Sequence, residues 1–187
     1  MTTVTTVLSD SESRMKKSVE ALKKELTNIR TGRASPALLD AVEALYYGTP
    51  TPIAQMATIT VPEARVIMIQ PWDKQAMGDI EKAILKSDLG LTPNNDGQAI
   101  RVTLPIPTEE RRRELVKTVS KRVEEGHISV RNIRRDGMDS IKAIQKNKEL
   151  SEDDSRRAQD QLQKLTDTYI QFMDTLGNEK EAEVMEI

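Results

Sequence analysis

Residues 108–149 read TEERRRELVKTVSKRVEEGHISVRNIRRDGMDSIKAIQKNKE, and their apolar pattern predicts a single long helix. At about 1.5 Å per residue, roughly 40 residues make a rod about 60 Å long. The positions on its apolar face alternate in steps of three and four: Val116, Val119, Val123, Gly126, Val130, Ile133, Gly137, Ser140 and Ile144. Each glycine costs a helix about 1 kcal/mol relative to alanine. Gly126 and Gly137 therefore predict close approach of a neighbouring helix.

Two further segments carry the same alternation. In residues 9–30 the apolar positions are Met15, Val19, Leu22, Leu26 and Ile29, and in residues 151–185 they are Ala158, Leu162, Leu165, Tyr169, Phe172 and Leu176. Steps of three and four correspond to about 3.5 residues per turn, the heptad pattern of helices that pack along their length. Three such segments in one chain predict an intramolecular three-helix bundle.

Residues 31–105 have a different character and predict a small inserted domain. Short β-rich runs lie at 42–47, 57–61, 65–70 and 100–104, and turn-forming residues separate them at 48–52, 62–64 and 93–97. One helix interrupts the strands, with Asp73 as its N-cap and Met77, Ile80 and Ile84 on its buried face. The predicted fold is α+β: an elongated bundle of residues 1–30 and 106–187, with a small β-rich α/β domain inserted at 31–105.

The chain passes between these two domains through segments rich in helix breakers. The first crossing covers residues 30–36 and the second covers residues 104–108. Short crossings between separately packed bodies are where a chain bends. The sequence therefore predicts hinge residues there, namely Gly32, Pro36, Pro105 and Pro107.

The composition argues against several classes of protein. There is no cysteine, which removes disulfides and thiolate zinc sites. His127 is the only histidine, and we expect it on the helix surface, toward the arginine side. No nucleotide-binding or hydrolase motif, signal-like N-terminus or run of about 18 apolar residues occurs. We therefore expect a cytoplasmic protein that is not an enzyme, has no membrane span and needs no cofactor or metal.

Three arginines within five residues stand out in a chain with 30 acidic and 28 basic residues. Arg131, Arg134 and Arg135 occupy helical positions i, i+3 and i+4, which are surface neighbours. Their planar guanidinium groups match phosphate well. The cluster predicts a polyanionic partner, although Glu124 interrupts the stripe of basic side chains along this helix. The alternative is a solvated face that Asp136 and Asp139 neutralise in part.

Charge is also distributed unevenly along the chain. Residues 108–149 carry 12 basic and 8 acidic side chains, whereas residues 150–187 carry 4 basic and 10 acidic ones. One helix would attract a polyanion and the next would repel it. Arg30 and Arg33 flank Gly32 as a second, weaker phosphate candidate, which a helix C-cap explains equally well. Few aromatic residues are present to stack on bases, so any contact with RNA should be to its backbone and shape.

Several stretches, taken in order, resemble the ribosome recycling factor family. They are RTGRASP at 30–36, YYGTPTP at 46–52, SDLGL at 87–91, VRNIRRD at 130–136, SEDD at 151–154 and QKLTD at 163–167. The resemblance covers essentially the whole chain. It implies an L-shaped molecule with dimensions similar to a transfer RNA, in which a flexible hinge joins a three-helix bundle to a small α/β domain.

The resemblance also implies a function, partners and site residues. Such proteins act after peptide release and, with elongation factor G and GTP, split the post-termination ribosome into subunits. The bundle is implied to lie on the large ribosomal subunit, against 23S rRNA, and the small domain to meet elongation factor G. We expect a monomer. The implied RNA contacts are Arg131, Arg134 and Arg112, with Arg135 as a supporting charge and Arg30 and Arg33 as the basic helix-end element.

A coiled-coil interaction protein or a chaperone-like protein without RNA binding is the competing hypothesis. In that case the apolar faces of the helices bind other proteins, and the arginines are merely solvated. A helix that packs in an intramolecular bundle and also binds other proteins needs an apolar face on more than one side. Residues 108–149 show only one such face.

Overall fold

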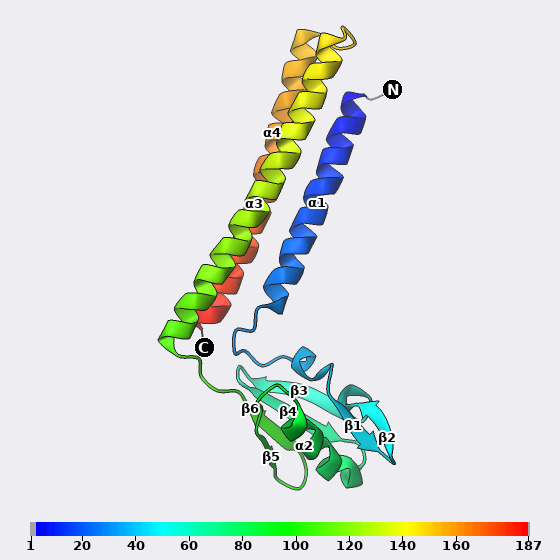
Figure 1. The fold of residues 1–187 in the computed structure, drawn as a ribbon, viewed down its shortest axis with the longest axis vertical. Coiled ribbons are helices and arrows are strands. Elements are labelled where there is room, and N and C mark those ends of the chain that lie inside the picture. Colours follow the sequence, from blue (N-terminus) through cyan, green and yellow to red (C-terminus); the bar gives the residue numbers. More distant parts are fainter. Residues whose placement is uncertain (1–2, 187) are drawn as a thin grey trace. The chain divides into compact units, whose positions relative to one another are not determined.

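The computed structural model describes residues 3–186, whose packing forms two compact units (Figure 1). The first, called the bundle below, combines the chain up to Arg30 with Glu109–Met185. The second, called the sheet unit, covers Thr31–Thr108 together with Glu186. The sheet unit is therefore inserted, in sequence, between the first and second helices of the bundle.

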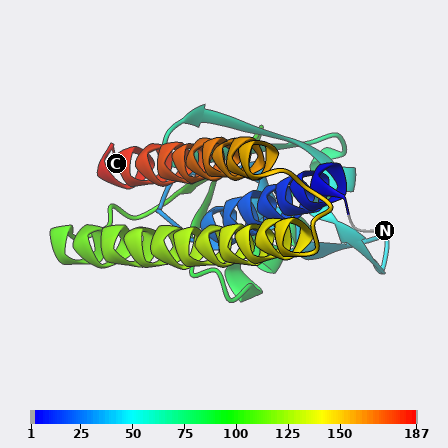
Figure 2. The ribbon, with the colours of Figure 1, turned by 90° about the horizontal axis from the view of Figure 1, so that it is seen from above.

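The bundle consists of α1 (Val4–Asn28), α3 (Glu109–Lys146) and α4 (Glu152–Met185), which lie side by side (Figures 1 and 2). α1 begins at Val4, earlier than the predicted start at residue 9, because Thr3 and Thr6 form a capping box. The backbone N–H of each threonine donates to the hydroxyl of the other. Val4, Val7 and Leu8 of these first turns pack in or against the core of the bundle, so the sequence did carry an apolar signal for the earlier start.

The buried residues of the bundle repeat every 11 residues, so the predicted heptad repeat is wrong. On α4 they are Ser155, Ala158, Leu162, Thr166, Tyr169, Met173, Gly177 and Val184. An 11-residue repeat has about 3.67 residues per turn, close to the roughly 3.6 of a straight helix. The predicted core residues Leu165 and Leu176 are only partly buried, and Phe172 is 51% exposed. The prediction failed because it followed the apolar residues, whereas threonine and glycine also fill the core.

On α3 the buried positions also differ from the predicted ones. Leu115 and Ile141 are buried there, whereas the predicted core residues Val116 and Ser140 are only partly buried. Each predicted position is one residue away from the observed one. An error of one residue rotates a helix by about 100°, which is enough to move a side chain from the core to its edge.

Glycines let the helices of the bundle approach one another closely. A Cβ added at each would lie too near a side chain of the next helix: Gly126 faces Met173 Sδ at 2.9 Å, Gly137 faces Leu162 Cδ2 at 2.7 Å, and Gly177 faces Val123 Cγ2 at 2.7 Å. The predicted close approach at Gly126 and Gly137 is confirmed. Gly177 adds a further contact of the same kind on α4.

The sheet unit combines a hairpin, an antiparallel sheet and one α-helix, which confirms the predicted α+β fold. The hairpin pairs β1 (Glu43–Tyr46) with β2 (Thr49–Pro52). The four-stranded sheet has the order β3 (Ala57–Glu63), β4 (Val66–Pro71), β6 (Ile100–Thr103) and β5 (Pro93–Asn95). Helix α2 (Met77–Lys86) buries Ile80 and Ile84 in the core of this unit.

Two segments that were predicted as turns form strands. Residues 49–52 are β2, and residues 93–95 are β5. Both contain proline, which cannot donate to a ladder and is confined to sheet edges. Each of these strands has only one neighbour, so the prolines are tolerated. Asp73 is confirmed as a cap, but it caps the 3-10 helix Lys74–Ala76 that precedes α2.

The two crossings of the chain contact each other within the sheet unit. Gly32 has a φ of +84°, a conformation that favours glycine. A Cβ at this position would lie 3.3 Å from the Cγ and Cδ atoms of Pro107. Pro36 begins the 3-10 helix Pro36–Leu39. That Gly32, Pro36, Pro105 and Pro107 act as hinges stays a prediction.

We expect Gly137→Ala to lower the free energy of unfolding by about 1–2 kcal/mol. The new methyl group would meet Leu162 and Ser11, which are both buried, and over-packing costs more than the roughly 1 kcal/mol that alanine gains in a helix. Urea unfolding followed by circular dichroism measures the change. Gly78→Ala in α2 is the matched control: no atom lies within 4 Å of its added Cβ, so stability should stay the same or rise. Equal stability of the two variants would contradict the close-approach argument.

Candidate nucleic-acid interface

Arg112, Arg131, Arg134 and Arg135 form the arginine surface, and all four belong to helix α3. Arg131 and Arg135 are exposed, whereas Arg112 and Arg134 are partly buried. In Arg112 and Arg134 the Nε atom is buried and has no hydrogen-bond partner among residues 3–186. An unsatisfied buried donor is costly.

Glu124 holds the exposed Arg131. The Nη1 group of Arg131 donates to Oε1 of Glu124 at 3.0 Å, one side chain being 54% and the other 56% exposed. This hydrogen bond is the main reason why the pKa of Glu124 lies below its ordinary value. The sequence pattern predicted Glu124 only as an interruption of the basic stripe on this helix. The spacing of seven residues between them, two turns of one helix, is the signal that was overlooked.

His127 lies between helices, which differs from the expected place on the arginine side of the surface. Its side chain is only 13% exposed, and its Nδ1 lies 3.4 Å from Oε2 of Glu124. Its Nε2 lies 2.8 Å from Oδ1 of Asp174 on α4, although not in good hydrogen-bond alignment. His127 follows Gly126, where α3 and α4 approach closely, and that approach draws it toward α4. Arg131, Glu124, His127 and Asp174 therefore form a continuous polar chain from α3 to α4.

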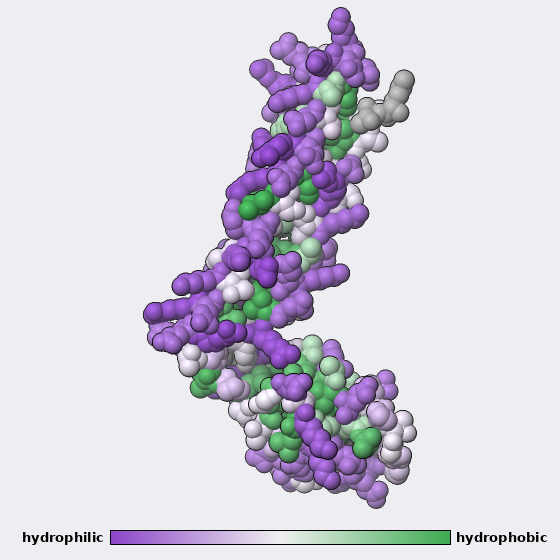
Figure 3. Space-filling model, viewed as in Figure 1, coloured by the Kyte–Doolittle hydropathy of each residue, from purple (hydrophilic) through white to green (hydrophobic). Residues whose placement is uncertain are grey.

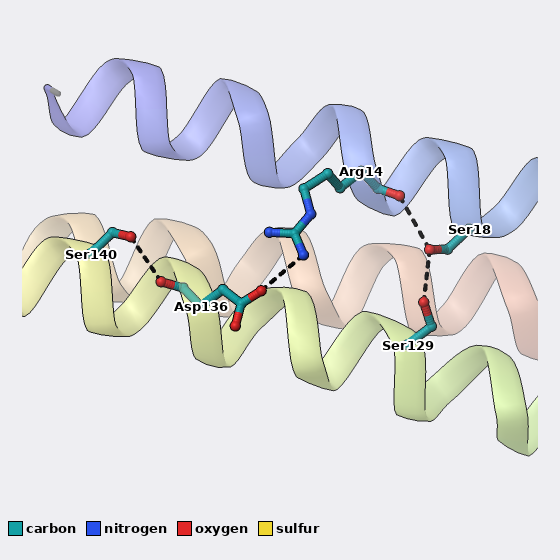
Figure 4. Close-up of polar contacts among 5 residues, drawn as sticks. All are labelled: Arg14, Ser18, Ser129, Asp136 and Ser140. Atoms are coloured by element: carbon teal, nitrogen blue, oxygen red, sulfur yellow. Dashed lines mark hydrogen bonds and ion pairs between the residues drawn. The ribbon is translucent and has the colours of Figure 1, made fainter.

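Asp136 does not neutralise the arginine cluster, contrary to the alternative considered for it. Its Oδ2 accepts a hydrogen bond from Nη2 of Arg14 on α1 at 2.8 Å (Figure 4). Beside this pair, the hydroxyl groups of Ser18 and Ser129 lie 3.0 Å apart and also link α1 to α3 (Figure 4). Asp136 is adjacent to the cluster in sequence, but it thus pairs with a residue of another helix.

Among the described residues, no other carboxylate neutralises Arg112, Arg134 or Arg135 either. In the part of the chain that the structure describes, no acidic group lies within 4 Å of the charged nitrogens of Arg112, Arg134 or Arg135. The two neighbours of Arg112 differ from it, since Arg111 pairs with Glu114 and Arg113 with Glu109. The arginine surface therefore keeps cationic groups that are not matched from within the protein.

The remaining basic candidates belong to different parts of the fold. Arg30 follows the end of α1 and is exposed, and it belongs to the bundle. Arg33 is also exposed but belongs to the sheet unit. A role for either residue in binding RNA stays a prediction.

The visible face of the bundle is mostly hydrophilic, with small hydrophobic patches between hydrophilic side chains (Figure 3). None of the helices in residues 3–186 is long and apolar enough to cross a membrane. These residues also contain no group of three or more histidine or acidic side chains arranged to hold a metal ion. What the arrangement offers chemically is a set of guanidinium donors on one rigid helix, which suits phosphate oxygens.

Comparison with known proteins gives consistent results. The family described as ribosome recycling factor matches residues 22–185. The ribosome-recycling factors of Heliobacterium modesticaldum and Halalkalibacterium halodurans are each 56% identical to this chain, over 95% and 97% of it and over 96% and 98% of their own lengths. A solution structure of a ribosome recycling factor has a TM-score of 0.73 and 44% identity, with both chains covered completely.

A second structural match includes partners. It comes from models for the T. thermophilus ribosome recycling factor and the E. coli elongation factor G bound to the E. coli post-termination complex. The TM-score is 0.65 and the identity is 44%, over 98% of this chain and 99% of the other.

We expect the pKa of Glu124 to rise toward its ordinary value in the variant Arg131→Gln, because the largest cause of its depression is removed. A lowered pKa in the folded state adds stability above the ordinary pKa, and that stability is lost as the pH falls through the folded-state value. NMR titration of the Glu124 side chain measures the shift. If Arg131→Gln leaves this pKa unchanged, the two groups do not interact in solution.

Proposed function

Since the chain belongs to the ribosome recycling factor family, we propose that it releases ribosomes for reuse after translation has terminated. With elongation factor G and GTP hydrolysis by that factor, it splits the post-termination ribosome into subunits and frees them from mRNA. It acts as a translation factor in the cytoplasm and has no catalytic site of its own. The related T. thermophilus factor, studied with elongation factor G on the post-termination complex, supports this proposal.

The unmatched arginines on α3 are the observation that carries the proposal. Among residues 3–186, no acidic group lies within 4 Å of the charged nitrogens of Arg112, Arg134 or Arg135, so acceptor oxygens of a partner can pair with them. RNA phosphates supply such oxygens at a regular spacing, and most contacts that position a protein on a nucleic acid go to the backbone. The bundle therefore binds 23S rRNA of the large ribosomal subunit through Arg131 and Arg134, with Arg112 and Arg135 in support.

Binding of this kind reads the shape of the RNA and not its sequence. The chain contains one tryptophan, three tyrosines and one phenylalanine, and none lies on α3. Bases that are splayed out for sequence readout usually stack on aromatic rings. The absence of aromatic rings from α3 favours docking on a structured RNA surface. In this proposal the protein acts as a monomer.

The second part of the proposal concerns movement between the two domains. The bundle, residues 1–30 and 106–187, holds the large subunit, and elongation factor G acts on the inserted domain, residues 31–105. The chain bends at Gly32, Pro36, Pro105 and Pro107. Gly32 in the first crossing has a positive φ, a conformation that glycine adopts readily.

The competing hypothesis of a coiled-coil interaction protein has less support. Its apolar helix faces would have to be available to other proteins. In the bundle the buried residues of α1, α3 and α4 form one shared core, which includes Met15, Val130 and Leu162. These faces are already occupied within the chain.

We expect the double variant Arg131→Glu/Arg134→Glu to bind large ribosomal subunits at least about 100-fold more weakly, because each charge-assisted hydrogen bond contributes about 1.5–3 kcal/mol. Cosedimentation with purified large subunits measures binding, and circular dichroism confirms folding. Arg156→Glu/Arg157→Glu on α4 is the matched control, since both of its arginines are exposed and the charge change is the same. Cosedimentation of the α3 variant at the wild-type level would remove Arg131 and Arg134 from the interface.

We further expect the wild-type protein to convert post-termination ribosomes into subunits only when elongation factor G and hydrolysable GTP are both present. Sucrose-gradient centrifugation separates the products. The Arg131→Glu/Arg134→Glu variant serves as the inactive comparison. If the correctly folded wild-type protein produces no subunits, the competing hypothesis is favoured.

A further inference from the structure

Three consecutive residues of the hairpin in the sheet unit expose large apolar side chains. Leu45 is 56% exposed, Tyr46 is 37% exposed, and Tyr47 is 79% exposed. Single exposed apolar residues are common on protein surfaces, but a contiguous group marks a place where another molecule binds. These three residues take no part in the arginine surface, which belongs to the other unit.

The exposed side chains line an open cavity of about 370 Å³. Leu45, Tyr46 and Tyr47 come from the hairpin, and Asp73 and Asp79 come from the segment that begins α2. All charged residues that line this cavity are acidic. A cavity with aromatic rings on one side and carboxylates on the other differs in chemistry from the arginine surface.

Contacts within the sheet unit hold the two rings in place. The Tyr46 and Tyr47 rings pack edge to face, with centroids 4.6 Å apart and planes at 76°. The Tyr47 hydroxyl donates to Oδ2 of Asp73 at 3.3 Å. The charge of Asp73 and this hydrogen bond raise the pKa of Tyr47 above its ordinary value. The rings are therefore positioned before any partner arrives.

The turn itself does not require a tyrosine. Tyr47 and Gly48 connect β1 to β2 and have φ values of +48° and +80°. Tight two-residue turns with positive φ at both positions prefer asparagine followed by glycine. A bulky residue is unfavourable at positive φ. Tyr47 thus stands where the fold alone would favour a smaller residue.

We propose that this cavity, called the tyrosine pocket, receives a lysine or arginine side chain from a protein partner. A cation is attracted to the face of an aromatic ring, and more strongly when it leaves water. Asp73 and Asp79 supply the opposite charge at the same place. RNA is disfavoured there, because its phosphates would meet two carboxylates, and residues 31–108 as a whole carry eight acidic and six basic side chains.

This inference rests on the proposed function only for the assembly in which the partner is sought, the post-termination ribosome with elongation factor G. The tyrosine pocket and the arginine surface then bind partners of different chemistry. The arginine surface takes RNA phosphate, and the tyrosine pocket takes a basic group of a protein.

The test uses variants that keep the sheet unit folded. Tyr47→Asn removes the ring and installs a residue that the turn prefers, so stability should not fall. Asp79→Lys reverses a charge at an exposed residue in the first turn of α2. Asp88→Lys makes the same charge change at an exposed residue outside the pocket and serves as the control.

We expect Tyr47→Asn and Asp79→Lys to slow splitting of ribosomes about three- to tenfold while cosedimentation with large subunits is unchanged, and Asp88→Lys to leave both unchanged. Splitting at the wild-type rate by both pocket variants would overturn the inference. Loss of binding to large subunits in the pocket variants would also overturn it, because the pocket would then belong to the ribosome-binding surface.

Cross-linking tests the pocket even if the wild-type protein splits no ribosomes. The chain lacks cysteine, so Thr49→Cys beside the turn can carry a single benzophenone probe, with Asp88→Cys as the control position. In purified post-termination complexes with elongation factor G, we expect a cross-link from position 49 to a protein peptide that contains lysine or arginine. Adding Asp79→Lys should abolish it. A cross-link to RNA only, no cross-link to protein, or a protein cross-link that survives Asp79→Lys, contradicts the proposal.

Discussion

The bundle depends on the close approach of its helices at Gly126, Gly137 and Gly177. Each glycine faces a side chain of a neighbouring helix where a methyl group would not fit, so the helices share a narrow core. A narrow core leaves most of the circumference of each helix to solvent. This is how a chain with only 37% hydrophobic residues supports long helices, and why α3 has a free outer face on which arginines can stand.

Intramolecular ion pairs determine which of those arginines stay available. Asp136 turns to Arg14 on α1, and Glu124 holds Arg131 while it also contacts His127. Exposed pairs of this kind contribute little to stability. Their larger effect is on the charges that they leave unmatched, because a partner can then approach Arg112, Arg134 and Arg135 without displacing a protein carboxylate.

The two units present opposite chemistry to their surroundings. The arginine surface of the bundle suits phosphate, and the tyrosine pocket of the sheet unit suits a basic side chain. Each set of groups is held by contacts inside its own unit, such as the hydrogen bond from Tyr47 to Asp73. In the proposed function this separation is an advantage, because neither surface attracts the partner proposed for the other.

The sequence by itself determined the three helices, the inserted α+β domain, the glycine contacts at positions 126 and 137 and the arginine cluster, because these follow from local spacing and composition. Only the tertiary structure decided the 11-residue repeat of the core, since a buried Thr166 or Gly177 carries no apolar signal. The tertiary structure also decided which charged side chains pair with each other. Asp136 lies far from Arg14 in sequence, and no local pattern shows that packing brings α1 and α3 together at that place. The strand β2 escaped prediction for a related reason, because proline is excluded from the middle of a sheet but tolerated at an edge, and only the fold shows which strand is at the edge.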